Sequence, residues 1–293
     1  GLVGIGVYFH ERLSRPTARP AAETALRRIL VQLMNSVEES DGGLTWHTSP
    51  ELLPQEVRDS HPQGYYNVGM AHGVPGVIAL LGILCEAGFD QSGGLDSDAR
   101  PLLAGAVDWL LARELPPEAA TRFPHLAGPG IAPAPSRLAW CYGDPAIAVA
   151  LLGAARRSGN TEWERAARRI ALDAAARSPE GSRVIDAGLC HGAAGLGHLF
   201  HRLHQATGEE ALAGAARFWF RQALDLRRPG EGVAGFLAWA PLPNGEEGWD
   251  ADPGFLTGAS GVALALLAAL SPIEPAWDRL LMVSIPDQET DVS

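Results

Sequence analysis

The sequence predicts an all-α protein built from repeated helical hairpins, and three observations support this fold class. Apolar residues recur at helical spacing along most of the 293 residues, as in residues 22–36, where Leu26, Ile29 and Leu33 share one face. Alternating β-type runs are scarce. A short pattern, G-x-x-G followed by an apolar helix, recurs along the chain, and repeats of this kind indicate a repeat architecture.

Beyond residues 22–36, the same spacing predicts six further helices, near residues 98–113, 145–157, 161–177, 193–206, 209–226 and 259–270. Three loop-rich stretches interrupt them, at residues 41–71, 115–136 and 228–255. The stretch 115–136 is rich in Pro, Gly and Ala and could be an interdomain linker. Because the repeat runs across it, we expect a single domain over residues 1–293 with long loops.

The repeat has four full copies and one degenerate copy. The full copies begin at Gly1, Gly73, Gly192 and Gly258, and the degenerate copy begins at Gly143 and carries Ala146 in place of its second glycine. Each copy can form a tight turn into a helix and let that helix pack closely on a neighbour, which is the simplest explanation for the glycines. Helical hairpins repeated in this way bury their apolar faces on one another, as an open solenoid or as a closed ring.

Composition excludes several classes of protein. The chain has 23 Lys and Arg against 34 Asp and Glu, a net charge of −11, which argues against a general nucleic-acid binder and against polybasic docking on a membrane. Its mean hydropathy of +0.01 is ordinary for a globular chain. No apolar run reaches the roughly 18 residues of a membrane helix, so we expect no integral membrane segment. Three cysteines are too few for a disulfide scaffold, and a reducing cytoplasm is the expected location.

The residues just before the repeat glycines carry the chemistry. His72, Cys141, Cys190 and His191 occupy equivalent places at the starts of predicted helices, so they converge at one end if the repeats pack around a centre. Two thiolates and one imidazole form a Cys₂His set, the ligand count of a catalytic zinc site with an open fourth position. The alternative is that both cysteines are small buried hydrophobes, and spacing alone leaves both interpretations open.

Four segments together resemble the lanthionine synthetase C (LanC) family, and they occur in the order of that family. They are GMAHGVPG (69–76), RLAWCYGDP (137–145), GLCHGAAG (188–195) and FLTGASG (255–261). The preceding GYYNVGMAHG (64–73) is similar to cyclases of bacterial lantibiotic pathways, and the resemblance runs from residue 1 to about residue 285. It implies an α/α toroid of helices around a zinc centre that joins cysteine thiols to dehydroalanine or dehydrobutyrine in a peptide.

By this resemblance, the ligands of one Zn²⁺ per chain are Cys141, Cys190 and His191. His72 matches the histidine of the family's AHG motif, a candidate acid or base. An imidazole with an ordinary pKa near 6.5 is suited to moving a proton near neutral pH. Zinc would lower the pKa of a substrate thiol, which is ordinarily about 8.5.

Further positions match less directly. Arg137 and Tyr142 fall on other active-site positions of the family, as residues that could stabilise an enolate or be positioned beside it. Asp144 is expected to have a structural or helix-capping role. The family also has a catalytic aspartate shortly before its first glycine repeat, which here is residues 1–4, and no residue matches it. We therefore expect the chain to lack the N-terminal part of the family's domain.

The leading prediction is a zinc-dependent lanthipeptide cyclase acting on a dehydrated precursor peptide. A dehydratase and an exporter are further partners that could work with it in a complex. One alternative is a LanC-like transferase that adds glutathione or another thiol to dehydroamino acids. The other is a zinc-containing scaffold that binds peptides without turnover. Three tryptophans in the loop-rich stretches could line a peptide groove, and these are Trp46, Trp239 and Trp249.

Two other features have simpler explanations. His198, His201 and His204 lie three residues apart and could indicate a second metal site. Because residues three apart drift by about 60° around a helix, a solvated or mixed face is the favoured interpretation. Cys85 lies within an apolar run and is expected in the core.

Overall fold

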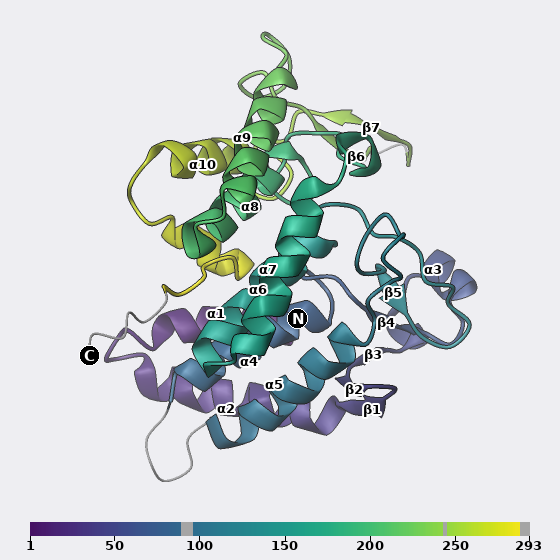
Figure 1. Cartoon of the computed structure of the whole chain (residues 1–293), viewed down its shortest axis with the longest axis vertical. Coiled ribbons are helices and arrows are strands. Elements are labelled where there is room, and N and C mark those ends of the chain that lie inside the picture. The colour runs from purple at the N-terminus through teal and green to yellow at the C-terminus, as the bar shows by residue number, and fades with distance from the viewer. Residues whose placement is uncertain (89–95, 243–244, 288–293) are drawn as a thin grey trace.

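The computed structural model describes residues 1–88, 96–242 and 245–287, and most of its elements are paired helices (Figure 1). The pairs are α1 (Leu2–Arg12) with α2 (Arg19–Ser36), α4 (Val74–Glu86) with α5 (Asp96–Leu111), α6 (Asp144–Ser158) with α7 (Thr161–Ala176), and α8 (Ala193–Thr207) with α9 (Glu210–Asp225). The last helix is α10 (Ala259–Leu270). All seven helices predicted from spacing are present, and each boundary lies within three residues of the prediction.

The helices form two layers. In the inner layer, α1 packs on α4, α4 on α6, α6 on α8, and α8 on α10, while the second helix of each pair covers the outside. Every residue of α4 except Glu86 is buried, and so is α6 from residue 144 to residue 155. Helices enclosed on all sides are apolar all round, which explains the apolar sequences of α4 and of residues 145–155 in α6.

The repeat glycines let the loops pass directly against the inner helices. A Cβ added at Gly195 would lie 2.0 Å from the carbonyl oxygen of Leu189, a contact that no side chain can make. The packing explanation is therefore confirmed at this position. The degenerate copy has no second glycine. Its first glycine, Gly143, adopts a φ of +127°, and Ala146 is fully buried at the position of the second glycine.

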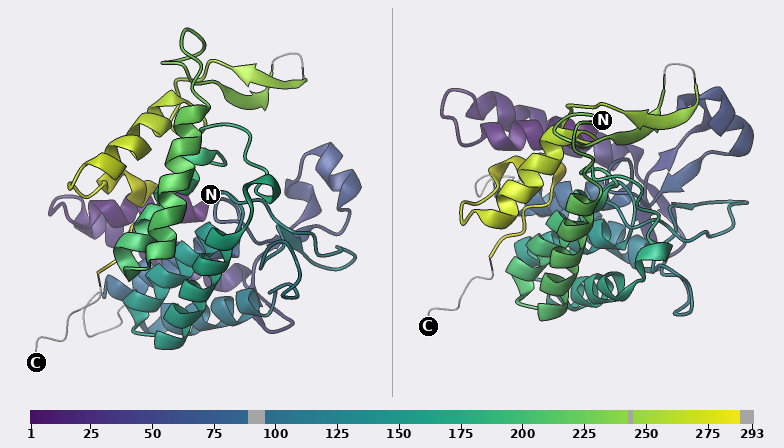
Figure 2. Two further views of the ribbon diagram at one scale, coloured as in Figure 1. Left: turned by 45° about the horizontal axis from the view of Figure 1, so that its top comes forward. Right: turned by 90° about the horizontal axis from the view of Figure 1, so that it is seen from above.

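Short strands of two to four residues lie within the three loop-rich stretches or directly before the first of them. β1 (Glu38–Ser40) pairs with β2 (Gly43–Thr45), β4 (Tyr65–Asn67) pairs with β3 (His47–Thr48) and β5 (Leu126–Ala127), and β6 (Ala238–Pro241) pairs with β7 (Glu247–Asp250), all antiparallel. Short helical segments lie between them: η1 (Pro50–Leu52), α3 (Gln55–Ser60) and η2 (Pro179–Gly181). The β6–β7 hairpin extends away from the helices (Figure 2).

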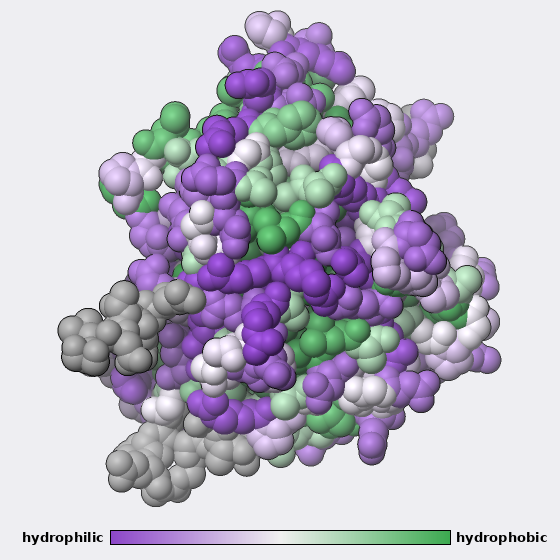
Figure 3. All heavy atoms as spheres, in the orientation of Figure 1, coloured by the Kyte–Doolittle hydropathy of each residue, from purple (hydrophilic) through white to green (hydrophobic). Residues whose placement is uncertain are grey.

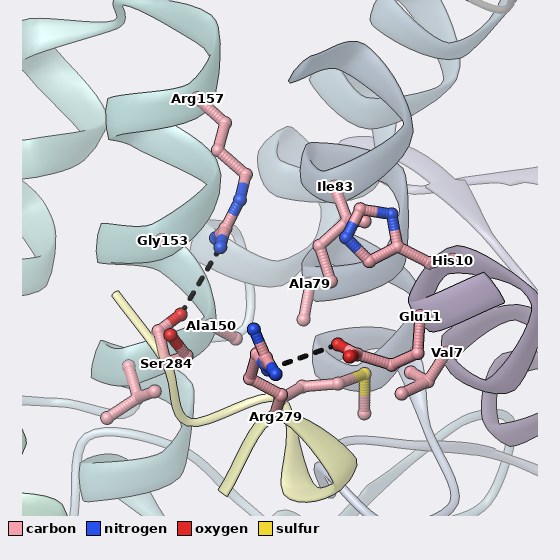
Figure 4. Close-up of a pocket in the computed structure, with 12 residues that line it drawn as sticks. Val7, His10, Glu11, Ala79, Ile83, Ala150, Gly153, Arg157, Arg279 and Ser284 are labelled. Atoms are coloured by element: carbon pink, nitrogen blue, oxygen red, sulfur yellow. Dashed lines mark hydrogen bonds and ion pairs between the residues drawn. The ribbon is translucent and has the colours of Figure 1, made fainter. Parts of the chain in front are cut away.

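The C-terminal segment returns to the beginning of the chain. It contains η3 (Ala276–Leu281), which contacts α1. Arg279 Nε lies 3.2 Å from Glu11 Oε1, and Arg157 Nη2 donates to the carbonyl oxygen of Ser284 at 3.3 Å, across a small pocket between α1, α4 and α6 (Figure 4). These contacts join the segment that follows α10 to α1 and to α6.

A buried ion-pair cluster fastens the same segment to α8. Asp278 is fully buried, and its Oδ2 lies 3.0 Å from His198 Nε2 and 3.1 Å from Arg202 Nε. His198 is buried, whereas His201 and His204 are half-buried, so the three histidines form the mixed face that was predicted. Cys85 is buried in the core, also as predicted.

The surface agrees with the composition. The face of the molecule seen in Figure 3 is mainly hydrophilic, with hydrophobic residues in separate smaller patches. Among the described residues, no helix combines the length and the apolar character needed to cross a membrane.

Candidate metal centre

The loops that precede α4, α6, α8 and α10 can be compared position by position, counting back from the first repeat glycine. In three of them an Asn or Asp lies six residues before the first repeat glycine, and its Oδ1 accepts the amide of the residue two positions on. These turns are formed by Asn67 with Gly69 at 2.9 Å, Asp186 with Gly188 at 3.0 Å, and Asp252 with Gly254 at 2.6 Å. In the degenerate copy the corresponding residue is Arg137. Such side-chain turns fix the backbone before each helix begins.

Main-chain hydrogen bonds then join the loops to one another. The amide of Ala71 donates to the carbonyl oxygen of Cys141 at 3.3 Å, the amide of Cys141 donates to that of Cys190 at 3.2 Å, and the amide of Cys190 donates to that of Leu256 at 2.8 Å. Equivalent positions of successive repeats therefore lie side by side. The prediction that these positions converge at one end of the inner helices is confirmed.

The two cysteines and the histidine of this ladder form a compact cluster. One ligand atom from each of Cys141, Cys190 and His191 lies within 4.8 Å of the others, and the described residues contain no other such cluster. Ligand atoms around tetrahedral zinc are about 3.5–3.8 Å apart, given Zn–S bonds of about 2.3 Å. Small side-chain adjustments would bring this set to that geometry. The donor types, two sulfurs and one imidazole, also suit zinc.

The electrostatics of the cluster favour a cation. The pKa of Cys141 is lowered to about 5, first by a hydrogen bond with Cys190 and further by His191 and Arg137, against the opposing effect of burial. The pKa of Cys190 is raised, mainly by its hydrogen bond with Cys141 and by burial. The two opposite shifts favour one thiolate and one thiol in the pair. A divalent cation would supply the positive charge needed to ionise the second thiol as well.

His72 lies beside this cluster in an open cleft of about 490 Å³. The imidazole is exposed, and its ring centroid lies 6.4 Å from that of Tyr142. Trp46 and Trp140 also line the cleft, so one of the three loop tryptophans does lie beside a predicted site residue.

Tyr142 and Arg137 face the cluster from the loop before α6. The hydroxyl of Tyr142 accepts a hydrogen bond from Asn67 Nδ2 at 2.7 Å, and burial is the main reason that the pKa of Tyr142 is raised. The charge of Arg137 acts on both cysteines and on His191. The structure thus brings all six predicted site residues to the same end of the inner helices.

Two residues of this site were not predicted from the sequence. Asn67 holds the hydroxyl of Tyr142, and the buried carboxylate of Asp186 lies 3.9 Å from His191. The available signal was the six-residue spacing from Asn67, Asp186 and Asp252 to the repeat glycines. Asp144 is structural, as expected, but its carboxylate accepts the amides of Arg122 and Phe123 instead of capping a helix.

Paired helices in two layers, with a Cys₂His cluster where the inner helices begin, define an α/α toroid with a candidate metal centre. The chain belongs to the lanthionine synthetase C-like family, whose model matches residues 1–282. Among solved structures it is similar to nisin cyclase, with a TM-score of 0.73 and 20% sequence identity over 97% of this chain. The chain spans 65% of the length of that protein. No curated protein matches it significantly in sequence.

Proposed function

We propose that the protein is a zinc-dependent lanthipeptide cyclase, which forms lanthionine or methyllanthionine by adding peptide cysteine thiols to dehydroalanine or dehydrobutyrine. The observation that carries the proposal is the Cys₂His cluster held by main-chain hydrogen bonds beside the His72 cleft. Membership of the lanthionine synthetase C-like family supports it. In this proposal, residues 1–293 act as one cyclase domain.

Cys141, Cys190 and His191 would hold the ion. When bound, zinc would supply an electrophilic fourth position that lowers the pKa of a substrate thiol. The three protein ligands set the charge there, because two thiolates already balance a divalent cation. A third thiolate from the substrate therefore keeps an excess negative charge and stays nucleophilic.

The remaining residues would act on the dehydroamino acid. The thiolate sulfur bonds to its β-carbon, and the electron pair of the double bond moves to the α-carbon and its carbonyl as an enolate. In this proposal the substrate thiol releases its proton to water, and His72 delivers a proton to the α-carbon and recovers one from water, to which its imidazole is exposed. Arg137 would stabilise the enolate oxygen, and Tyr142 would orient it.

The cleft agrees with a peptide substrate. Its lining combines apolar and aromatic side chains, including Trp46, Trp140 and Met70, with the polar rings of His47 and His72. An open cleft of this kind can admit an extended chain segment, whereas a small closed pocket could not. The partner that we propose is a dehydrated precursor peptide, made by a dehydratase that acts beforehand.

The test uses the purified protein with zinc and a peptide that contains one dehydroalanine and one cysteine. Cyclisation leaves the peptide mass unchanged, so loss of the free thiol is followed by alkylation and mass spectrometry. We expect thiol loss with the parent protein and none with Cys190→Ala.

Two other outcomes would each contradict the proposal and favour an alternative. A mass increase equal to glutathione, when glutathione competes with the peptide thiol, would indicate a thiol transferase. Saturable peptide binding with no loss of thiol and no adduct would indicate a scaffold that binds peptides without turnover.

A further inference from the structure

Asp186 is a buried carboxylate that joins three parts of the candidate site. It is 1% exposed and lies six residues before Gly192, at the start of the loop that contains Cys190 and His191. Its Oδ1 accepts the amide of Gly188 at 3.0 Å, and its Oδ2 accepts the amide of Trp239, in β6, at 3.0 Å. The same Oδ2 lies 3.9 Å from Nε2 of His191.

These contacts fix the carboxylate in place. Each oxygen is held by a main-chain amide, and the two amides come from segments about 50 residues apart in the chain. A Cβ at Gly192 would lie 2.4 Å from Asp186 Oδ1, so the carboxylate also packs directly under the first turn of α8. A group held in this way can orient a neighbour without moving itself.

At the equivalent positions of other repeats, the choice between Asn and Asp matches the hydrogen-bonding group that the side chain contacts. Asn67 carries an amide, and its Nδ2 donates to the hydroxyl of Tyr142 at 2.7 Å. Asp252 carries a carboxylate, and its Oδ2 accepts the hydroxyl of Thr257. The group that the second side-chain atom contacts is thus an acceptor where the chain has Asn and a donor where it has Asp. Asp186 fits the second case if Nε2 of His191 carries the hydrogen.

We infer that Asp186 is a positioning residue for the metal centre, which accepts the Nε2–H of His191 and leaves Nδ1 as the metal-binding atom. This inference rests on the proposed zinc centre. The separation of 3.9 Å is longer than a hydrogen bond, so the imidazole would have to tilt towards the fixed carboxylate to donate to it. Metal-ligating histidines usually donate their second ring N–H to such a carboxylate or carbonyl, which fixes the tautomer and raises ligand basicity.

The test compares Asp186→Asn with Asp252→Asn, a matched control in the same repeat position. Asparagine keeps the Oδ1 that accepts the amide two residues on, as Asn67 shows within this chain. It replaces the oxygen that faces His191, which also accepts the amide of Trp239, with an NH₂ group, which cannot accept. Zinc affinity is measured by competition with a chromophoric chelator, and the ligand geometry is followed by the absorption spectrum of the cobalt(II) form.

We expect Asp186→Asn to weaken zinc binding by about 10- to 100-fold and to change the cobalt spectrum, as loss of a carboxylate behind a ligand histidine does elsewhere. Asp252→Asn should keep the affinity and spectrum of the parent protein. Circular dichroism checks that both variants are folded. If Asp186→Asn is unfolded, Asp186→Ser provides the same comparison, because its hydroxyl can still accept the amide of Gly188.

Two results would overturn the inference. The first is that Asp186→Asn has the zinc affinity and the cobalt spectrum of the parent protein. The second is that Asp186→Asn and Asp252→Asn lose zinc affinity equally, which would mean that Asp186 only stabilises the turn at Gly188. The proposed function fails separately. A parent protein that binds zinc but does not cyclise a dehydrated peptide would contradict the cyclase and leave the role of Asp186 intact, whereas a parent protein that binds no zinc would overturn both.

Discussion

The carbonyl oxygen of Cys190 accepts the amide of Cys141 at 3.2 Å, so the two candidate sulfur ligands are joined through their main chains. The same oxygen accepts the amide of Trp140 at 3.0 Å. The distance between the two ligand positions is therefore set by backbone hydrogen bonds, which do not depend on either sulfur atom. Removal of a sulfur should abolish metal binding and leave the loops in place.

The first prediction follows from the independence of the loop backbone from the sulfur atoms. Cys190→Ala should contain no zinc after purification without chelators, whereas the parent protein should contain about one zinc per chain. Its helical circular dichroism should match that of metal-free parent protein. Elemental analysis measures the metal. Cys85→Ala is the control, because Cys85 lies in the core outside the cluster and its loss should leave the zinc content unchanged. Zinc retained at the parent level in Cys190→Ala would exclude this cysteine as a ligand.

The second prediction separates proton delivery from metal binding. His72→Ala should keep its zinc and cyclise a dehydrated peptide about 10²- to 10⁴-fold more slowly, the usual contribution of a general acid. It should also give a mixture of stereoisomers at the α-carbon, because water would then protonate the enolate from either side. Chiral chromatography of the hydrolysed product measures this mixture. His47→Ala is the control, since His47 lines the same cleft and its Nε2 contacts the carbonyl oxygen of Gln63 at 2.9 Å. A parent rate and a single stereoisomer from His72→Ala would rule out this role.

The third prediction concerns the repeat glycines. Gly195→Ala should destabilise the protein by about 1–3 kcal/mol or more, because its Cβ would lie 2.0 Å from a main-chain oxygen that cannot move freely. Gly4→Ala changes the same repeat position in α1, where nothing lies within 4 Å of the added Cβ. This control should gain about 0.5–1 kcal/mol from the higher helix propensity of Ala. Chemical denaturation measures both. Equal effects of the two substitutions would show that close packing is not the reason for the glycines.

Much of the fold is predictable from the sequence because its helices are long and periodic. The apolar spacing in α6 to α10 places each boundary within two residues. The alignment of Cys141 with Cys190 also follows from the sequence, since each lies two residues before a glycine that begins an inner helix. Local spacing was sufficient there because equivalent repeat positions are stacked by the same main-chain bonds.

Other features depend on contacts that local patterns do not contain. β3 and β5 have two residues each, too few to show an alternating pattern. The role of Asp186 depends on Trp239, which is brought beside it by a hairpin far along the chain. The burial of His198 likewise depends on Asp278, which lies 80 residues away.

The last prediction concerns Asp144, whose buried carboxylate accepts the amides of Arg122 and Phe123 at 2.9 and 3.1 Å. Burial raises the pKa of Asp144 from its usual 3.8 to about 6, although these amides and two nearby arginines oppose the shift. Between these two values the folded protein binds more protons than the unfolded chain, so stability falls as pH rises.

A shift of about two pH units corresponds to about 3 kcal/mol, present in full below about pH 4 and lost as pH rises through about 6. Asp144→Asn cannot ionise and should lack this contribution, although it loses one of the two amide bonds at every pH. We therefore expect the stability of the metal-free parent protein, relative to Asp144→Asn, to fall by up to about 3 kcal/mol between about pH 4 and pH 7. Denaturation in the presence of a chelator keeps metal binding out of the comparison. Parallel stability curves for the two proteins would mean that Asp144 ionises in the folded protein as easily as in the unfolded chain.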